Sequence, residues 1–422
     1  MPPTLQPQAA VRRRFHVMVK PAGALCNLDC SYCFYLHKET LLGQPKQPRI
    51  SDELLEEHIR QYIEAQDGER VVFSWQGGEP TVLGLPFFEK VVALQAKYRR
   101  AGQAIDNDLQ TNGVLLTEEW AAFLAQHGFM VGLSVDGPAH LHDKHRPSKG
   151  GKGSHAGALA AARLLQKHGV PFAALAVVNR DSAREPLAVY RHLVDELGAW
   201  RVQFTPCVEA KNFREQAPCL WPKDARAEVG SPRAHPGHPL SVVTEWSVDP
   251  DDWGRFLVAV WDEWFARDLG RVHVNLFETA VAQSMGLPAQ TCTQSEFCGK
   301  ALALEHDGSL YACDHFVYPE FRLGNIRTLD EGRAAFSARQ QAFGFAKRDT
   351  LPSDCRRCPH LTLCWGECPK NRLLTTRGGE SGLNYLCRGW QAFYTHIEPG
   401  LAVIGAQLGK MPQHTRMMET PP

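Results

Sequence analysis

The sequence predicts an α/β fold in which about six βα units form one parallel sheet, curled into a complete or partial TIM-like (β/α)6 barrel, with a loop-rich C-terminal segment behind it. Two observations carry this prediction. Short runs of β-branched and aromatic residues alternate with amphipathic stretches as far as Pro206, and eight of the 13 cysteines lie between Cys292 and Cys387. In such folds the functional residues lie at the carboxyl ends of the strands.

Six strands are expected in the first half of the chain, at residues 15–20, 71–75, 105–110, 130–135, 172–178 and 201–205. Amphipathic patterns between these strands predict helices. One helix is expected to begin behind Ser51, whose hydroxyl suits the N-cap, and another to open at Thr117 with acidic residues in its first turn. Residues 15–206 are therefore expected to form the barrel.

The pattern changes after the barrel. Residues 207–290 are expected to form a linker or bridging region with helices: a stretch with five prolines that ends at Pro239 predicts a linker or lid, and a helix is expected to start behind Asp249. Residues 291–393 are rich in glycine and cysteine and show little continuous apolar pattern, so we expect this segment to depend on bound metal for its fold. Residues 394–422 are expected to form a tail.

The composition excludes several classes of partner. Lys plus Arg and Asp plus Glu number 46 each, which leaves no basic excess for a phosphate backbone, so nucleic acid is not expected. The longest apolar runs, such as residues 256–260, fall far short of the roughly 20 residues that a bilayer requires, so no membrane is expected either. Arg12, Arg13 and Arg14 resemble the start of a secretion signal, but Lys20 and Pro21 interrupt the apolar stretch after them, and we expect a cytoplasmic protein.

The first cysteine motif lies directly after the first expected strand. Cys26, Cys30 and Cys33 have the spacing C-x3-C-x2-C, and cysteines of a cytoplasmic chain favour metal ligation over disulfides. A [4Fe-4S] cluster normally takes four thiolates, so three leave one iron open to a small molecule that chelates through an amine and a carboxylate. A zinc site completed by His37 is the alternative.

Two further motifs lie at the ends of expected strands. Gly77 and Gly78 let the backbone approach a ligand and Glu79 can accept an ammonium, although paired glycines also form simple turns. Ser134 closes the fourth strand, and Arg146 lies twelve residues later. Hydroxyl and guanidinium can hold a ribose or a carboxylate there, or Arg146 is a solvated surface residue. The nearby histidines are expected to lie in a solvated loop and not in a metal site: His140, His142 and His145.

These motifs, with the aromatic residues around Cys33, resemble the radical S-adenosylmethionine superfamily over about residues 15 to 206. The resemblance implies a partial barrel and a cluster that gives one electron to S-adenosylmethionine, cleaving it to methionine and a 5′-deoxyadenosyl radical. It further implies that Cys26, Cys30 and Cys33 hold the cluster. The cosubstrate contacts that it implies are Tyr32 for adenine, Gly77, Gly78 and Glu79 for the methionine amine, Ser134 and Arg146 for the remainder, and the backbone of Val208 for adenine.

The second cysteine group provides eight thiols, enough for two four-cysteine sites, and zinc ribbons satisfy the same count. Its centre has the spacing C-x2-C-x5-C-x3-C. The arrangement resembles the SPASM extension, which implies two auxiliary [4Fe-4S] clusters and three clusters in all. The resemblance gives one cluster Cys292, Cys298, Cys313 and Cys368, and the other Cys355, Cys358, Cys364 and Cys387.

Residues 313–319 and 323–326, read with the cysteine spacings, resemble the anaerobic sulfatase-maturating enzymes over about residues 15 to 393. These enzymes convert a cysteine or serine of a sulfatase polypeptide, unfolded or nascent, to Cα-formylglycine, and the resemblance implies an electron donor such as flavodoxin or ferredoxin. Asp314 matches their proposed base and is expected to take the thiol or hydroxyl proton, unless it is only a turn residue.

Two other functions remain open at this point. The first is a maturase of the same superfamily that forms thioether or carbon–carbon crosslinks in a ribosomal peptide. The second is a passive electron carrier or zinc-stabilised binding protein with no chemistry of its own. The sequence leaves the choice between cysteine and serine substrates open as well.

Overall fold

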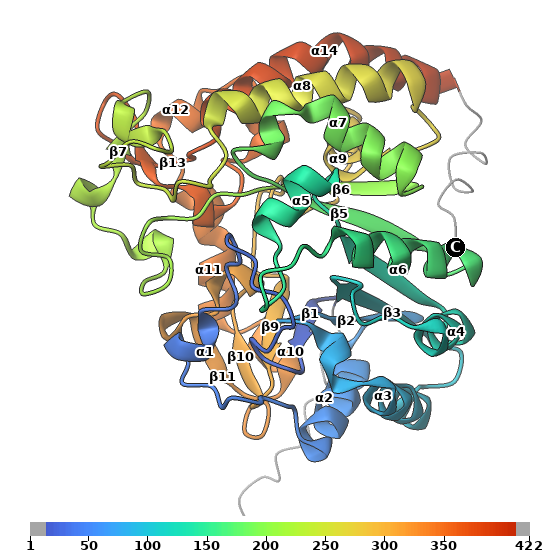
Figure 1. The fold of residues 1–422 in the computed structure, drawn as a ribbon. Coiled ribbons are helices and arrows are strands. Elements are labelled where there is room, and N and C mark those ends of the chain that lie inside the picture. Colours follow the sequence, from blue (N-terminus) through green and yellow to red (C-terminus); the bar gives the residue numbers. More distant parts are fainter. Residues whose placement is uncertain (1–13, 411–422) are drawn as a thin grey trace, which may run out of the picture.

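The computed structural model describes residues 14–410. In this part of the chain a ten-stranded sheet forms the centre of the molecule, in the order β11-β10-β9-β1-β2-β3-β4-β5-β6-β8 (Figure 1). Its six central strands run parallel, in chain order, and confirm the expected positions: β1 (His16–Lys20), β2 (Arg70–Trp75), β3 (Ala104–Thr111), β4 (Phe129–Ser134), β5 (Phe172–Val178) and β6 (Arg201–Pro206).

The helices between these strands cover the outside of the sheet. They are α2 (Asp52–Ala65), α3 (Leu85–Tyr98), α4 (Glu118–Gln126), α5 (Ala139–His145), α6 (His155–Lys167) and α7 (Pro186–Arg191), which continues as the π-helix η3 (His192–Glu196). The predicted caps are confirmed, because Ser51 accepts a hydrogen bond from Leu54 N–H and Thr117 accepts one from Trp120 N–H.

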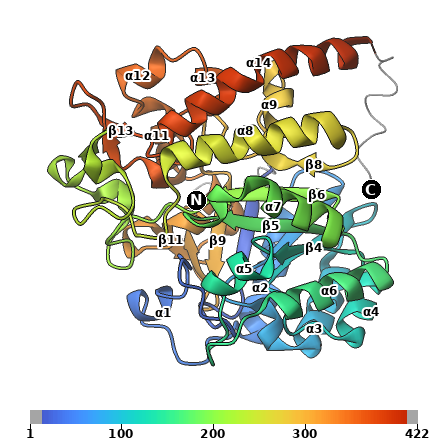
Figure 2. The same cartoon turned by 45° about the horizontal axis from the view of Figure 1, so that its top comes forward.

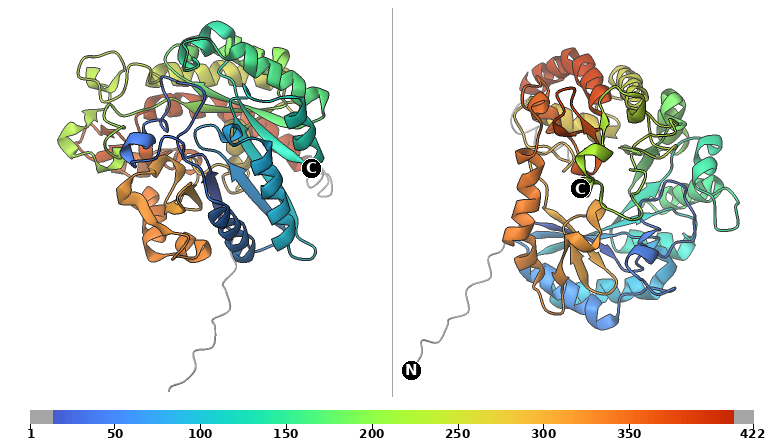
Figure 3. Two further views of the ribbon diagram at one scale, coloured as in Figure 1. Left: turned by 60° about the horizontal axis from the view of Figure 1, so that its bottom comes forward. Right: turned by 90° about the vertical axis from the view of Figure 1, so that its left-hand side faces the viewer.

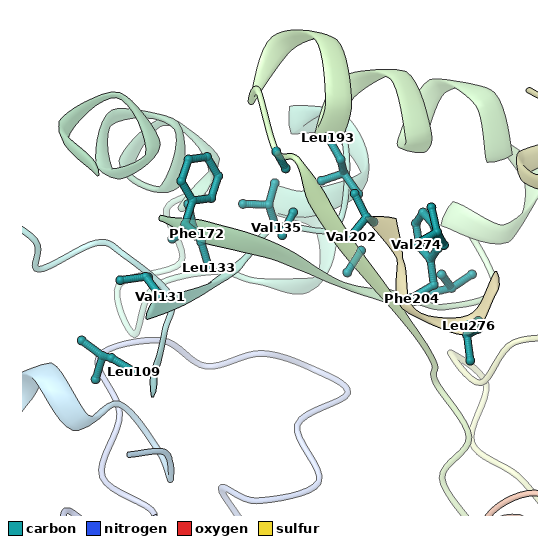
Figure 4. Close-up of a cluster of buried hydrophobic side chains, with 14 of the residues drawn as sticks. Leu109, Val131, Leu133, Val135, Phe172, Leu193, Val202, Phe204, Val274 and Leu276 are labelled. Carbon is teal, nitrogen blue, oxygen red and sulfur yellow. The ribbon is translucent and has the colours of Figure 1, made fainter. Parts of the chain in front are cut away.

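The core lies between the strands and these helices. Figure 4 shows part of it, in which side chains of β4, β5 and β6 such as Leu133, Phe172 and Val202 pack together. All three are buried, and the same continuous core includes Trp75 of β2. The predicted fold class, a partial α/β barrel, is therefore confirmed.

The C-terminal segment extends this same sheet, which the sequence did not indicate. β9 (Ala301–Glu305) pairs in parallel with β1, and β10 (Ser309–Tyr311) and β11 (Arg322–Asn325) follow it in antiparallel fashion. The expectation that residues 291–393 contribute little continuous core is wrong for β9, since Leu302 and Leu304 are fully buried.

The region after the barrel contains the predicted helix and a small second sheet. α8 (Pro250–Arg267) begins behind Asp249, which caps it, and lies alongside α14 (Cys387–Lys410) (Figures 1 and 2). The second sheet joins the proline-rich segment to the cysteine-rich segment: β7 (Ala227–Glu228), β12 (Leu374–Thr375) and β13 (Ser381–Leu383).

The remaining elements are short. They are α1 (Lys38–Leu41), β8 (His273–Val274), α9 (Asn275–Ser284), α10 (Glu331–Ala335), α11 (Ala338–Asp349), α12 (Ser353–Arg356), α13 (Leu361–Cys364), and the 3-10 turns η1 (Pro80–Leu83), η2 (Ser182–Arg184), η4 (Pro218–Leu220), η5 (Lys223–Ala225), η6 (Pro232–Ala234), η7 (Asp314–Phe316), η8 (Pro319–Phe321) and η9 (Pro369–Asn371). In the right-hand view of Figure 3 the orange C-terminal strands and α11 stand beside the blue strands of the barrel.

The predicted domain boundaries at residues 206, 290 and 393 stay predictions, and α14 crosses the last of them. None of the helices within residues 14–410 combines the length and the apolar character that a bilayer crossing needs. Arg12 and Arg13, two of the arginines that resemble the start of a secretion signal, lie outside the described residues.

Candidate active site

The first cysteine motif forms a loop directly after β1, at the carboxyl end of the sheet. Cys26, Cys30 and Cys33 are free thiols and electrostatic neighbours of one another. Burial raises the pKa of Cys26 to about 11 and that of Cys30 to about 12. Leu28 N–H donates to Cys26 Sγ and Tyr35 N–H to Cys33 Sγ, each at 3.4 Å. Buried thiols of this kind become thiolates when they bind a metal, because the metal supplies the missing positive charge.

The glycine pair after β2 packs against this cysteine loop. Gly78 N–H donates to Gly23 O and Glu79 N–H to Leu25 O, both at 2.8 Å. A Cβ atom on Gly78 would lie 2.0 Å from Leu25 O, and Gly77 has φ +124°, so both positions require glycine. The pair therefore fixes the backbone immediately before the first cysteine.

Glu79 is buried, and its carboxylate is engaged inside the protein. It accepts hydrogen bonds from the Thr81 amide and hydroxyl, the Thr111 hydroxyl and the Asn112 amide, at 2.7–3.1 Å. Glu79 thus ties the loop after β2 to the end of β3. The expected contacts of Gly77, Gly78 and Glu79 with a methionine amine stay predictions.

Asp136 connects two of the predicted cosubstrate residues. Its carboxylate accepts from the Tyr32 hydroxyl, and from Arg146 Nε at 2.9 Å and Nη2 at 3.1 Å. Burial favours the neutral acid, but the Arg146 charge and these hydrogen bonds hold the pKa of Asp136 below its usual value. The solvated-surface alternative for Arg146 is wrong, since the residue is 7% exposed. Ser134 lies two residues before Asp136, and its hydroxyl accepts from Gln110 Nε2 at 2.9 Å.

The expectation of a solvated histidine loop is wrong for two of its three members. His142 and His145 are buried, and only His140 is exposed. His142 Nδ1 accepts from Asp136 N–H at 3.3 Å, and His145 Nδ1 lies 2.8 Å from Ser31 Oγ. Both imidazoles thus support the loops that carry the residues predicted to contact the cosubstrate.

Asp314, on η7 behind β10, forms an ion pair with Lys20 at the end of β1. The sheet explains this pair, since β9 lies beside β1 with Glu305 opposite Lys20 in register. Burial favours the neutral acid, but the charges of Lys20, His315 and Lys38 hold the pKa of Asp314 below its usual value. The side chain keeps 14% exposure. A largely buried carboxylate that keeps some access to solvent therefore lies at the carboxyl end of the barrel.

A second buried ion pair lies nearby. Lys370 Nζ is 2.6 Å from Glu209 and donates to Val208 O at 2.8 Å. Val208, which was predicted to contact adenine through its backbone, is thus held by the C-terminal segment. The sequence did not point to Lys20, Glu209 or Lys370, because a single charged residue in a sequence carries no sign of burial. Asp136 had one signal, its place in the Ser-Val-Asp-Gly run after β4.

The eight downstream cysteines form two groups of electrostatic neighbours. Burial and then the thiols of Cys292, Cys368 and Cys298 raise the pKa of Cys313 well above its usual value. Burial and then the thiols of the second group raise the pKa of Cys387. The two groups coincide with the sets that the resemblance implied: Cys292, Cys298, Cys313 and Cys368, and separately Cys355, Cys358, Cys364 and Cys387.

The donor set at all three places consists of thiols, the usual ligands of iron–sulfur clusters. His37, the fourth ligand of the zinc alternative, packs its ring against Phe213, with the ring centroids 4.9 Å apart. The free thiols at all three places thus fit iron–sulfur clusters.

Basic residues lie beside the cysteine group that contains Cys292 and Cys298. Lys347 is buried, and its Nζ donates to Cys292 O and Thr293 O, both at 2.7 Å. Arg372 is an electrostatic neighbour of Cys298 and of thiols in the second group. Such cations offset the negative charge of thiolates and tune a bound cluster.

Comparison with known proteins agrees with this geometry. The radical SAM superfamily matches residues 22–193, and the SPASM iron–sulfur cluster-binding domain matches residues 292–359. A serine-type anaerobic sulfatase-maturating enzyme of Bacteroides thetaiotaomicron is 41% identical over 93% of this chain and 91% of its own length. The chain belongs to the anaerobic sulfatase-maturating enzymes. It is a radical SAM enzyme with a SPASM segment, as the motifs predicted.

Other members of the family differ in their stated substrate type. A serine-type enzyme of Klebsiella pneumoniae is 38% identical over 91% of this chain and 87% of its own length. A cysteine-type enzyme of Clostridium perfringens is 29% identical over 91% and 96%. Among solved structures, native anSMEcpe with bound AdoMet and Cp18Cys peptide has a TM-score of 0.79 and 30% identity, covering 93% of this chain and 99% of that one.

Proposed function

We propose that this enzyme oxidises a serine or cysteine side chain of a sulfatase polypeptide to Cα-formylglycine, using S-adenosylmethionine and three [4Fe-4S] clusters. The 41% identity along 93% of the chain with a serine-type sulfatase-maturating enzyme carries the proposal. The bound AdoMet and cysteine peptide of the similar solved structure support both the cosubstrate and a peptide substrate.

The eleven cysteines have separate tasks in this proposal. Cys26, Cys30 and Cys33 hold the first cluster and leave one iron for the cosubstrate, and the two downstream groups hold the auxiliary clusters. When bound, these groups and S-adenosylmethionine supply hydrogen-atom abstraction and an electron acceptor. The Tyr32–Asp136–Arg146 group holds the cosubstrate, together with Gly77, Gly78, Glu79, Ser134 and the backbone of Val208.

Asp314 takes the proton from the substrate hydroxyl or thiol. Lys20 keeps its carboxylate ionised, and the remaining exposure of the side chain lets a substrate atom reach it. We expect that Asp314→Asn, which keeps the side-chain shape, binds all three clusters and cleaves S-adenosylmethionine but makes little formylglycine. The measurement is product yield per 5′-deoxyadenosine released. Wild-type yield in this variant would remove Asp314 from the role.

The partners follow from the same chemistry. The reacting residue must reach a largely buried carboxylate, so the sulfatase is bound as an unfolded or nascent chain. An electron donor such as flavodoxin or ferredoxin reduces the first cluster. A reducing cytoplasm suits the free cysteines of the chain.

The proposal is tested with anaerobically reconstituted enzyme and a pair of sulfatase-motif peptides that differ only in the target residue. We expect about twelve irons per chain. Formylglycine formation lowers the mass of a cysteine peptide by about 18 Da and that of a serine peptide by about 2 Da. A crosslink lowers the mass of the cysteine peptide by about 2 Da only, so that result would favour the peptide-crosslinking alternative.

A further inference from the structure

Three buried lysines and two carboxylates meet around η7. Lys20 pairs with Asp314, and Lys370 pairs with Glu209. Lys38, the first residue of α1, has neither carboxylate as an ion-pair partner. It is an electrostatic neighbour of Glu209, Asp314 and Lys370, so it belongs to the same charged group. Lys20 and Lys370 therefore each have a carboxylate partner, whereas Lys38 has neither of these two carboxylates as an ion-pair partner.

Lys38 is 1% exposed, and its Nζ has no hydrogen-bond partner among the described residues. The nitrogen lies 3.2 Å from the centroid of the Tyr318 ring, four residues beyond Asp314. Burial lowers the pKa of Lys38 to about 7, against the opposing attraction of Glu209 and Asp314. An aromatic face replaces only part of the hydration that a buried amine loses, so an N–H donor without an acceptor at this place calls for a ligand.

Asp314 is one of the carboxylates whose charge acts on Lys38, so a substrate atom that reaches the Asp314 carboxylate can supply this acceptor. A serine hydroxyl oxygen can accept a hydrogen bond from an amine while its own proton points to a carboxylate. A thiol sulfur is a weak acceptor, so it gains little from the same amine. Lys38 donates in either protonation state, because the neutral amine also carries N–H groups.

We propose that Lys38 donates a hydrogen bond to the hydroxyl oxygen of the substrate serine while Asp314 accepts its proton, and that Lys38 thereby favours serine over cysteine substrates. This inference rests on the proposed function. The higher identity to serine-type relatives, 41% against 29% for a cysteine-type enzyme, agrees with it.

The test compares wild type with Lys38→Met, a variant of similar length without N–H donors. The holoenzyme is assayed on the two peptides that differ only in serine or cysteine. We expect the ratio of kcat/KM for the serine peptide to kcat/KM for the cysteine peptide to fall about tenfold or more. A change of this size corresponds to the free energy of one hydrogen bond to a charged group. Lys38→Arg, which keeps a donor, should retain most of the preference. Lys97→Met, which replaces an exposed lysine of α3 that pairs with Glu56, is the matched control.

The ratio is taken within one preparation, so it does not depend on the active fraction. Removal of an unpaired buried amine should also leave the melting temperature unchanged or raised. An unchanged ratio in Lys38→Met, with wild type converting both peptides, overturns the role of Lys38 and leaves the proposed function intact. Failure of wild type to convert either peptide overturns the proposed function, and the inference with it.

Discussion

The contact between Gly78 and the cysteine loop gives a prediction about the first cluster alone. In Gly78→Ala the new Cβ would lie 2.0 Å from Leu25 O and 2.5 Å from Leu25 C. Ordinary contacts begin near 3.4 Å, so the loop must withdraw by about 1.4 Å. Gly78 N–H and Glu79 N–H then lose their 2.8 Å bonds to Gly23 O and Leu25 O. Overpacking and two lost hydrogen bonds together cost about 2–6 kcal/mol.

Because Leu25 precedes Cys26, this displacement moves the first thiolate of the motif. We expect iron in Gly78→Ala to fall from about twelve to about eight atoms per chain, with S-adenosylmethionine cleavage lost and the auxiliary clusters retained. Iron and sulfide quantitation with electron paramagnetic resonance measures this. Gly150→Ala is the matched control, since its Cβ would meet nothing closer than Ser148 Oγ at 3.9 Å. Full iron content and wild-type cleavage in Gly78→Ala would refute the reasoning.

Two further predictions concern the surroundings of the clusters and the cosubstrate. Lys347→Met leaves Cys292 O and Thr293 O without their donor, so we expect loss of about four irons with S-adenosylmethionine cleavage retained, and unchanged iron would contradict this. Burial lowers the pKa of His142 from 6.5 to about 4, so the unfolded chain takes up a proton at this residue before the folded protein does. The free energy of unfolding is therefore unaffected by His142 above pH 6.5 and decreases as the pH falls towards 4. The melting temperature of wild type should therefore drop more between pH 7.5 and 5 than that of His142→Gln. Exposed His127→Gln is the control, and equal drops in wild type and His142→Gln would contradict the lowered pKa of His142.

The sequence predicted the elements whose signals are local. Six strands, the caps at Ser51 and Thr117 and the cysteine motifs follow from residue type and spacing along a short stretch of chain. Lys20 carried no such signal. Its burial and its pairing with Asp314 result from the parallel pairing of β1 with β9, which joins segments almost 300 residues apart. Contacts of that range depend on the folded sheet and cannot be read from a local pattern.

The same reasoning explains why His142 and Lys38 were misjudged or overlooked. Histidine and lysine are usually exposed, so composition favours a solvated position for each. His142 is buried because α5 folds back on the Asp136 loop, and Lys38 lies under the ring of Tyr318, which follows η7 in the C-terminal segment. Both cases depend on packing between segments that the sequence presents separately.

The continuous sheet also decides how the site is assembled. β9 covers the edge of β1, which otherwise presents unpaired backbone groups to solvent. The chain then passes through β10 into η7, and this path brings Asp314 to Lys20 and Tyr318 to Lys38. The barrel supplies the cysteine loop and the Asp136 group, whereas the C-terminal segment supplies the carboxylate proposed to accept the proton. Neither part holds the complete site, because the strand pairing that stabilises the fold is the same pairing that brings these residues together.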